Sequence, residues 1–566
     1  MACLNWYWPR YLSVPKETKI NLFGKEPEFE FRLNKISKAS IIIPRFIGAF
    51  TIIIVSASIF NIWITQYKNY NSLYSLLYLA GTTIFISLLF SEKFSIWLKK
   101  FIKHKYILWL IITLFIFLLG YSIYKNFTKT HDILIYSLGF LWLTIIFAFI
   151  TILRKETKFY FRILLWIKKI RVPNLIFISA YILMILFIIV NIYIELAHKI
   201  SPIQIFLLGI IFYTMLFNQL YFYLRRSPLN ALIGLILLVI LIIVYFVLPD
   251  KHYYVRIDKN IDTERLEIRT YIKNWIKYRE TDILRYKQKN LKYPIFVLAS
   301  HGGGSRSAYW TTLITTRLND STKGEFSKHL IALSGISGGS EGIAFYTALL
   351  AHKQRNNLPD TISRIIDKIL RRDYLSSSVA MMLGRDFWLS FIPGINASDR
   401  AAVFEKEWGN TLDEVLKDTT YHWFEKNINE LYYSPDSVNY LLPLIFLNTT
   451  QVSEGQRAII SPVKTGNNFI MAYDLIDSIN KYSGINSSLK LSTSALLSAR
   501  FPYINPAGKI DSLGYFVDGG YFERSGALTA SEIINEIDKA LKEYPDTNIS
   551  KNINIYAISI VNAINN

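Results

Sequence analysis

Three glycine-rich motifs carry the residues of this chain that could do chemistry. In chain order they are HGGGSR at 301–306, GISGG at 335–339 and DGG at 518–520. Consecutive glycines let backbone N–H groups converge on a developing oxyanion, and a serine held between glycines can act as a nucleophile. A carboxylate at a strand end can accept the proton of that serine. The three motifs together predict acyl-transfer chemistry.

The serine motif follows an apolar run at 330–333, which predicts a strand, and a helix is predicted from Gly339 onward. Ser337 therefore falls at a strand–turn–helix corner, where small neighbours avoid clashes and the positive end of the helix favours an oxyanion. A second match overlaps the first at 338–342, but it would put Ser340 inside the first helical turn. Ser337 is the preferred nucleophile.

The first glycine run follows another predicted strand, at 295–299. A Walker-type phosphate loop would end in Gly-Lys-Ser/Thr, which is absent here, so the backbone of Gly302, Gly303 and Gly304 is predicted to form an oxyanion hole. Arg306 has two interpretations. It either faces the oxyanion or a lipid phosphate, or it holds the loop through a salt bridge.

The residues alone do not identify the general base that would activate Ser337. The chain has eight histidines, the last of which is His422. An α/β-hydrolase places its histidine late in the chain, after the serine and the acid. His352 and His422 are formally available, and Asp518 is the alternative. Asp-Gly-Gly is also an ordinary turn sequence, so this motif by itself does not decide the matter.

Charge and apolar residues are unevenly distributed along the 566 residues. Residues 1–250 hold 26 Lys and Arg against 9 Asp and Glu, and the remainder holds 37 against 33. This basicity is typical of loops that face anionic lipid headgroups, so no nucleic-acid partner is expected. The single cysteine, Cys3, excludes a disulfide within the chain and a Cys-based metal site.

Seven apolar segments before residue 250 are long enough to cross a bilayer, which needs about 20 residues each. They are 46–65, 72–91, 106–124, 133–153, 174–195, 203–224 and 228–248. The expectation is an α-helical transmembrane bundle of about seven helices, hence a multi-pass integral membrane protein of a bacterial inner membrane. Loop charges predict a cytoplasmic N-terminus. An odd number of crossings then makes the C-terminal half extracytoplasmic, and an even number makes it cytoplasmic.

The membrane half contains no evident charge at mid-bilayer, which favours an anchor or a lipid-facing platform over a transport or sensing role. The basic, aromatic stretch 154–171 is either a helix lying on the membrane surface or an inter-helix loop.

Four regions follow from these patterns: a polar tail at 1–40, the transmembrane region at 41–250, a linker with a docking helix at 251–289, and a catalytic domain at 290–566. The docking helix is predicted at 262–286, with Ile268, Ile272, Trp275 and Ile283 on one stripe.

The catalytic domain alternates short strands with helices. Strands are predicted at 295–299, 330–333, 440–447 and 553–560, with helices at 341–352 and 361–370 among them. This alternation predicts an α/β domain with a mainly parallel sheet and helices on both faces. In such sheets the sites lie at the carboxyl ends of the strands, where both glycine motifs fall.

The set of motifs resembles the patatin-like phospholipase family, over about residues 290–563. That family has G-G-G-x-R/K for the oxyanion hole, G-x-S-x-G for the nucleophile and D-G-G/A for the base. Residues 447–455, the stretch 492–495 and Phe501-Pro502 resemble secondary blocks of the family. The chain departs from the family pattern at His301, where aspartate is commoner, and at Ser307, where glycine is common.

The resemblance implies a patatin-like acyl hydrolase domain with a Ser–Asp dyad. Ser337 is then the nucleophile and Asp518 the general base, whose pKa desolvation must raise. Gly302, Gly303 and Gly304 hold the oxyanion together with Gly338, and neither metal nor cofactor is required.

The function implied is a membrane-anchored serine lipid acyl hydrolase of the phospholipase A or lysophospholipase type. Its partners are the lipid bilayer and a membrane phospholipid or other acyl lipid as substrate. The alternatives are a lipid acyltransferase, which needs the same residues, and a non-catalytic lipid-binding or sensing protein.

Overall fold

The computed structural model describes residues 172–225, 228–247, 253–356, 362–389, 399–418, 420–466, 468–501, 504–511 and 513–561, with scattered residues between 49 and 145. The chain divides into two compact units. One consists of Ile189–Phe206 and Val239–Asn566, and the other of Met1–Ile188 and Leu207–Leu238.

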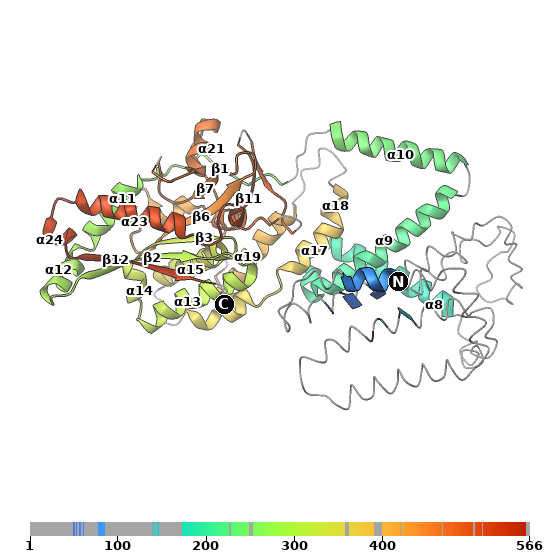
Figure 1. Ribbon diagram of the computed structural model, residues 1–566, viewed down its shortest axis with the longest axis horizontal. Coiled ribbons are helices and arrows are strands. Elements are labelled where there is room, and N and C mark those ends of the chain that lie inside the picture. Colours follow the sequence, from blue (N-terminus) through green and yellow to red (C-terminus); the bar gives the residue numbers. More distant parts are fainter. Residues whose placement is uncertain are drawn as a thin grey trace, which may run out of the picture. The chain divides into compact units, whose positions relative to one another are not determined.

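The first of these units is built on an eight-stranded sheet (Figure 1). Its centre is four parallel strands, which lie in the order β6, β3, β2, β12. Their bounds are β2 Tyr293–Ser300, β3 Leu330–Ile336, β6 Leu444–Gln451 and β12 Ile553–Ile560. The four strands predicted from the sequence are therefore confirmed, the third of them shifted toward the C-terminus.

The other four strands make the sheet mixed. β11 (Gly514–Asp518) and β7 (Arg457–Ile460) both pair antiparallel with β6, and β10 (Gly508–Ile510) pairs antiparallel with β11. β8 (Ala472–Asp474) runs parallel to β7. The connection from β6 to β7 is only a short turn, and such a connection can join only antiparallel neighbours. The sheet is therefore mixed, and the parallel arrangement expected from the sequence holds for its four central strands.

Helices cover both faces of this sheet, as predicted (Figure 1). α15 (Gly338–Asn356) packs on β3 beside α13 (Gly304–Ser321) and α22 (Leu491–Ser498). On the other face, α23 (Ala527–Lys542) packs on β2 and β3, and α11 (Ile268–Tyr278) packs on α23.

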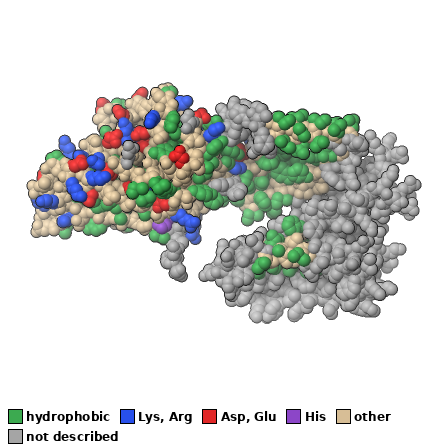
Figure 2. All heavy atoms as spheres, turned by 45° about the horizontal axis from the view of Figure 1, so that its top comes forward, with side chains coloured by type: hydrophobic (Ala, Val, Ile, Leu, Met, Phe, Trp, Pro, Cys, Tyr) green, Lys and Arg blue, Asp and Glu red, His purple; other side chains and the backbone are tan. Residues whose placement is uncertain are grey.

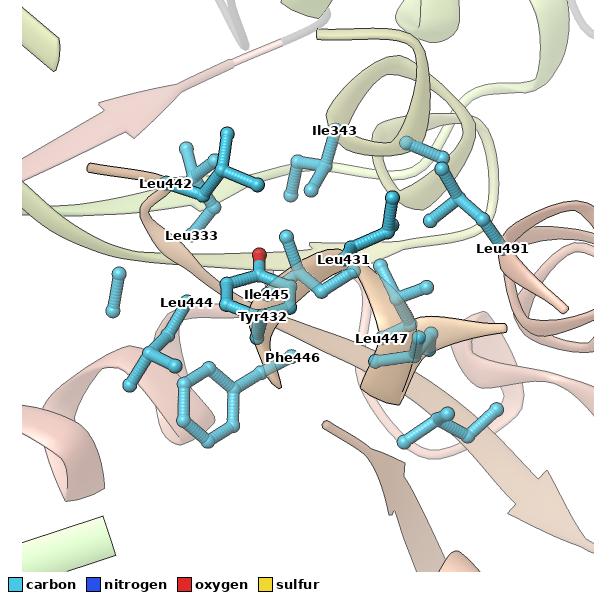
Figure 3. Close-up of a cluster of buried hydrophobic side chains, with 14 of the residues drawn as sticks. Leu333, Ile343, Leu431, Tyr432, Leu442, Leu444, Ile445, Phe446, Leu447 and Leu491 are labelled. Atoms are coloured by element: carbon cyan, nitrogen blue, oxygen red, sulfur yellow. The ribbon is translucent and has the colours of Figure 1, made fainter. Parts of the chain in front are cut away.

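The core lies between these layers. Every residue of β3 and β6 is buried, which is typical of strands that are covered on both faces. Figure 3 shows Leu333 of β3, Ile343 of α15, and Leu444, Ile445 and Phe446 of β6 within this cluster.

The docking helix predicted at 262–286 is two helices, α11 and α12 (Glu280–Gln288), with the break at Arg279. The Arg279 guanidinium is buried and donates to the carbonyls of Lys328 and Tyr440, at 3.3 and 3.2 Å. These contacts hold Arg279 at the junction between the two helices. Helical periodicity in the sequence does not predict them. The predicted stripe of Ile268, Ile272, Trp275 and Ile283 is buried, as expected.

The remaining elements of this unit are short or peripheral. The predicted helix 361–370 consists of the 3-10 turn η3 (Ser363–Ile365) and α16 (Ile366–Leu370). The others are α14 Glu325–His329, α17 Leu375–Leu383, α18 Arg385–Leu389, α19 Arg400–Leu416, α20 Ile428–Tyr432, α21 Leu475–Ser483, η4 Gly519–Tyr521, α24 Thr547–Ser550, β1 Asp258–Lys259, β4 Tyr433–Ser434, β5 Ser437–Val438 and β9 Ser487–Ser488.

The prediction of a transmembrane bundle of about seven helices is wrong. In the part of the chain that the structure describes, one helix, Pro202–Leu220, is long and apolar enough to cross a membrane. It belongs to α9 (Pro202–Arg225), which follows α8 (Val172–Ile192) and the 3-10 turn η2 (Ile194–Lys199) and precedes α10 (Pro228–Val247). Figure 2 shows the hydrophobic side chains that α10 exposes.

The correction rests on the apolar stretches among the described residues. In α8 and α10 these stretches are Ile178–Ile192 and Leu232–Ile243, of 10–17 residues each, fewer than the roughly 20 that a bilayer crossing needs. Glu195 and Lys199 fall in η2, where the fifth predicted segment ends.

The prediction of a multi-pass integral membrane protein is wrong for the same reason. The extracytoplasmic placement of the C-terminal half depended on an odd number of crossings and no longer follows. The predicted segments 46–65, 72–91, 106–124 and 133–153 lie outside the described residues apart from scattered positions, and the stretch 154–171 lies outside them entirely.

Candidate active site

Ser337 occupies the corner between β3 and α15. β3 ends at Ile336 and α15 begins at Gly338, so Ser337 makes the turn alone, with φ of +53°. This left-handed backbone conformation costs an ordinary residue about 1–2 kcal/mol. Two hydrogen bonds hold it: Ser337 N–H donates to Ser498 Oγ at 3.2 Å, and Glu341 N–H donates to the Ser337 carbonyl at 3.1 Å. Strain of this kind clusters at functional sites.

The glycine loop lies directly against this corner. A Cβ added to Gly338 would come within 2.0 Å of the Gly304 carbonyl oxygen, and one added to Gly302 would come within 3.2 Å of Ser337 Cβ. Residue 338 must therefore be glycine for the loop and the corner to approach each other. Two motifs that are more than 30 residues apart in the sequence meet here.

The loop turns tightly between β2 and α13, with φ of +149° at Gly303 and +61° at Gly304. Gly302 N–H donates to the Arg524 carbonyl at 2.9 Å, so this N–H is engaged within the protein. Among the described residues, no acceptor is bonded to the N–H of Gly303, Gly304 or Gly338. The first N–H groups of a helix have no partner within it, and they carry the positive end of the helix dipole. The N-termini of α13 and α15 both present such groups beside Ser337.

Asp518 ends β11, opposite Thr449 of the neighbouring β6. Its N–H donates to the Arg500 carbonyl at 2.9 Å, and its Oδ1 accepts from Gly520 N–H at 2.7 Å. The side chain is buried, and burial raises the pKa of Asp518 above its ordinary value. Hydrogen bonding to the Ser337 side chain and to Gly520 N–H opposes this rise in pKa. The structure thus brings Ser337 and Asp518 together.

Two buried residues that sequence reasoning missed support the corner from below. Asn448 of β6 donates to the Gly335 carbonyl at 2.8 Å and to Ser334 Oγ at 3.2 Å, and it accepts from Thr529 Oγ1 at 2.6 Å. Ser498 donates to the Asn448 carbonyl at 2.5 Å. The sequence signal for Asn448 is the polar run NTTQ at 448–451, which directly continues an apolar strand and is therefore expected to be buried with it.

A buried ion pair continues this network. Arg457 Nη2 lies 2.7 Å from Glu532 Oε2, both side chains are 5% exposed or less, and Arg457 also hydrogen-bonds to Thr529. Asn448 is therefore linked through Thr529 to a fixed charge pair between β7 and α23.

The alternative residues take structural roles. Ser340 is buried and its Oγ bonds to Ser498 Oγ at 2.7 Å, so it anchors α15. His352 lies on α15 about four turns beyond Ser337, roughly 20 Å along the helix. Its ring accepts from Trp423 Nε1 at 3.1 Å, and His422 pairs with Asp413 at 2.6 Å. Neither contact brings a histidine to the serine.

His301 and Arg306 flank the glycine run, and the structure places each of them. His301 Nε2 is 3.4 Å from Ser559 Oγ at the end of β12. Arg306 is exposed in the first turn of α13. Within the described residues, no three His, Cys, Asp or Glu side chains come together as metal ligands would.

Comparisons with known proteins add little to this geometry. No protein-family model matches the sequence, and no curated protein matches it. Among solved structures, VipD from Legionella pneumophila is similar at 14% identity, over 41% of this chain and 46% of that chain, with a TM-score of 0.22. The chain thus spans less than half the length of VipD, and a TM-score this low establishes neither a shared fold nor a shared activity.

Proposed function

We propose that residues 290–566 form a serine lipid acyl hydrolase of the patatin-like phospholipase kind, which works through a Ser337–Asp518 dyad. One observation carries the proposal. Ser337 is held in a strained corner beside the buried Asp518 carboxyl, whose pKa is raised, and beside two helix N-termini. This arrangement supplies a nucleophile, a base and oxyanion donors within one site.

In the proposed reaction Asp518 accepts the Ser337 proton as Oγ attacks the ester carbonyl. The oxyanion is held by the N–H groups of Gly303, Gly304 and Gly338, and Gly302 is left out of this set because its N–H is bonded to Arg524. The tetrahedral intermediate collapses to an acyl-enzyme as its C–O bond to the alcohol breaks and the protonated alcohol leaves, and water then cleaves the acyl-enzyme to release the carboxylic acid and free Ser337. The raised pKa suits Asp518 to this task, since a stronger base accepts the serine proton more readily.

Exposed apolar side chains beside the dyad support an acyl lipid as the substrate. Phe501 directly follows Arg500, whose carbonyl holds Asp518, and Tyr521 lies three residues after Asp518. The two rings are 56% and 57% exposed, and they stack with centroids 6.4 Å apart. Large apolar side chains left in water next to polar catalytic groups are typical of a site for a hydrophobic ligand.

Release of fatty acid from phospholipid vesicles by the purified full chain tests the proposal. We expect release by the parent and by S531A, a control at an exposed serine of α23, and none by S337A or D518N. Release that persists in S337A would refute the proposed nucleophile. Failure of the parent to cleave phospholipids, lysophospholipids and neutral glycerides alike would refute the proposed activity.

A further inference from the structure

Glu341 is a second carboxyl at this site, and the sequence motifs give it no role. Between Ile331 and His352 every residue is buried except Ser337 and Glu341, which are both half-buried. The two are one helical turn apart and are joined by the hydrogen bond from Glu341 N–H to the Ser337 carbonyl. Within this stretch, Ser337 and Glu341 are therefore the two residues that solvent can contact.

The environment of Glu341 is unusual for a surface carboxylate. Among the described residues its carboxyl has no hydrogen-bond or ion-pair partner, and Asp518 is the charged group whose field acts on it. Burial and the negative charge of Asp518 raise the pKa of Glu341 to about 8. Glu341 is thus protonated at neutral pH. Asp518 differs in that Ser337 and Gly520 N–H favour its charged form.

Other titratable groups lie on the elements around Glu341 and Asp518. Tyr374, which precedes α17, interacts electrostatically with Glu341, and burial raises its pKa out of the physiological range. α22, β2, β3 and β6 carry no charged residue. The other helices near α15 carry further charged groups: Arg306, Arg317 and Asp320 on α13, and Arg400, Glu405, Lys406, Glu407, Asp413 and Glu414 on α19.

We propose that Glu341 is the general acid that protonates the leaving group of the ester, an inference that rests on the proposed hydrolase function. Two carboxyl groups whose environments push their protonation states apart can divide acid and base work between them. Here the base would be Asp518, and the acid would be Glu341, one turn beyond the nucleophile.

The proton transfers balance over one turnover. In acylation, Ser337 Oγ bonds to the carbonyl carbon and gives its proton to Asp518. The C–O bond to the alcohol then breaks, its electron pair stays on the leaving oxygen, and that oxygen takes the Glu341 proton. In deacylation, water attacks the acyl carbon and gives a proton to the Glu341 carboxylate. The Ser337 oxygen leaves with the proton held by Asp518, so both carboxyls return to their starting states and one water is consumed.

Leaving-group dependence distinguishes this role from a structural one. A p-nitrophenolate is a weak base that departs without a proton, whereas a glycerol alkoxide is a far stronger base and needs one. We expect E341Q to lower kcat/KM for a glycerol ester about 100-fold or more, and to leave kcat/KM for the p-nitrophenyl ester of the same fatty acid within about 3-fold. E341D, which keeps the acid, should retain more glycerol-ester turnover than E341Q. E454Q, at an exposed glutamate, is the matched control.

The pH profile gives a second readout. With the glycerol ester, kcat/KM of the parent should fall as the pH rises through about 8, where Glu341 loses its proton. With the p-nitrophenyl ester this alkaline decline should be missing.

Equal losses on both esters in E341Q, or no loss on either, would overturn the assignment of Glu341 while leaving the dyad intact. A parent enzyme that cleaves neither ester would instead refute the proposed function, and this inference with it.

Discussion

Replacement of Gly338 by alanine tests how the glycine loop and the nucleophile corner fit together. The added Cβ would lie 2.0 Å from the carbonyl oxygen of Gly304, 2.7 Å from its carbonyl carbon and 2.9 Å from its nitrogen. Real Cβ contacts essentially never fall below 3.0 Å, so the two backbones must separate by about 1 Å. The proposed oxyanion donors Gly303, Gly304 and Gly338 would no longer converge.

The size of the effect follows from this displacement. A misplacement of about 1 Å costs about 100-fold in rate, and loss of one oxyanion donor costs about 10²–10³-fold, equivalent to ~2.7–4 kcal/mol. We therefore expect G338A to lower kcat for a soluble acyl ester by about 10²–10³-fold. The free energy of unfolding should fall by only about 1–3 kcal/mol, the usual range for an overpacked site.

The matched control is G409A in α19, where an added Cβ would meet only Phe424 Cβ, at 3.9 Å. It should keep parental activity, and its stability should be equal or higher by up to about 1 kcal/mol, because alanine favours a helix over glycine. Ester hydrolysis and urea denaturation of both variants make the comparison. Parental kcat in a folded G338A protein would refute the reasoning that close contact between loop and corner builds the oxyanion hole.

Three further predictions concern the support of the dyad. S498A should lower stability by about 1–3 kcal/mol and also lower kcat, because buried partners at Ser337 and Asn448 lose a hydrogen bond; parental values of both would contradict this role. R457M should lose about 3–5 kcal/mol on urea denaturation because it leaves Glu532 buried and unpaired, and the R457M/E532L double variant should recover most of that loss; a double variant as unstable as R457M would argue against the ion pair as the cause. Because burial raises the pKa of folded Asp518, its favourable contribution is complete below the ordinary aspartate pKa and is lost as the pH rises through the folded value. D518N should therefore be more stable than the parent at pH 7 and no more stable at pH 3, and equal stability at pH 7 would contradict the raised pKa.

The sequence predicted the α/β half well because its signals there are local. The strands at 295–299 and 330–333 are continuous apolar runs, and the glycine motifs mark the turns that follow them. The meeting of Ser337 with Asp518 could be expected only from the set of motifs, since no local pattern links residues 181 positions apart.

Other features depend on tertiary contacts that no periodicity records. The engagement of Gly302 N–H by Arg524, the support from Asn448 and Ser498, and the partial exposure of Glu341 arise from distant segments. The transmembrane prediction rested on apolar composition along the chain, whereas among the described residues one helix, Pro202–Leu220, meets both the length and the apolarity that a crossing needs.

The central claim is that Asp518 activates Ser337 as a nucleophile. Labelling of the purified full chain with a fluorophosphonate, followed by mass spectrometry of the modified peptide, tests this claim most directly. We predict one adduct on Ser337, none in S337A, and a labelling rate at least about 100-fold lower in D518N. An adduct on another residue, or a D518N protein labelled as fast as the parent, would contradict the dyad.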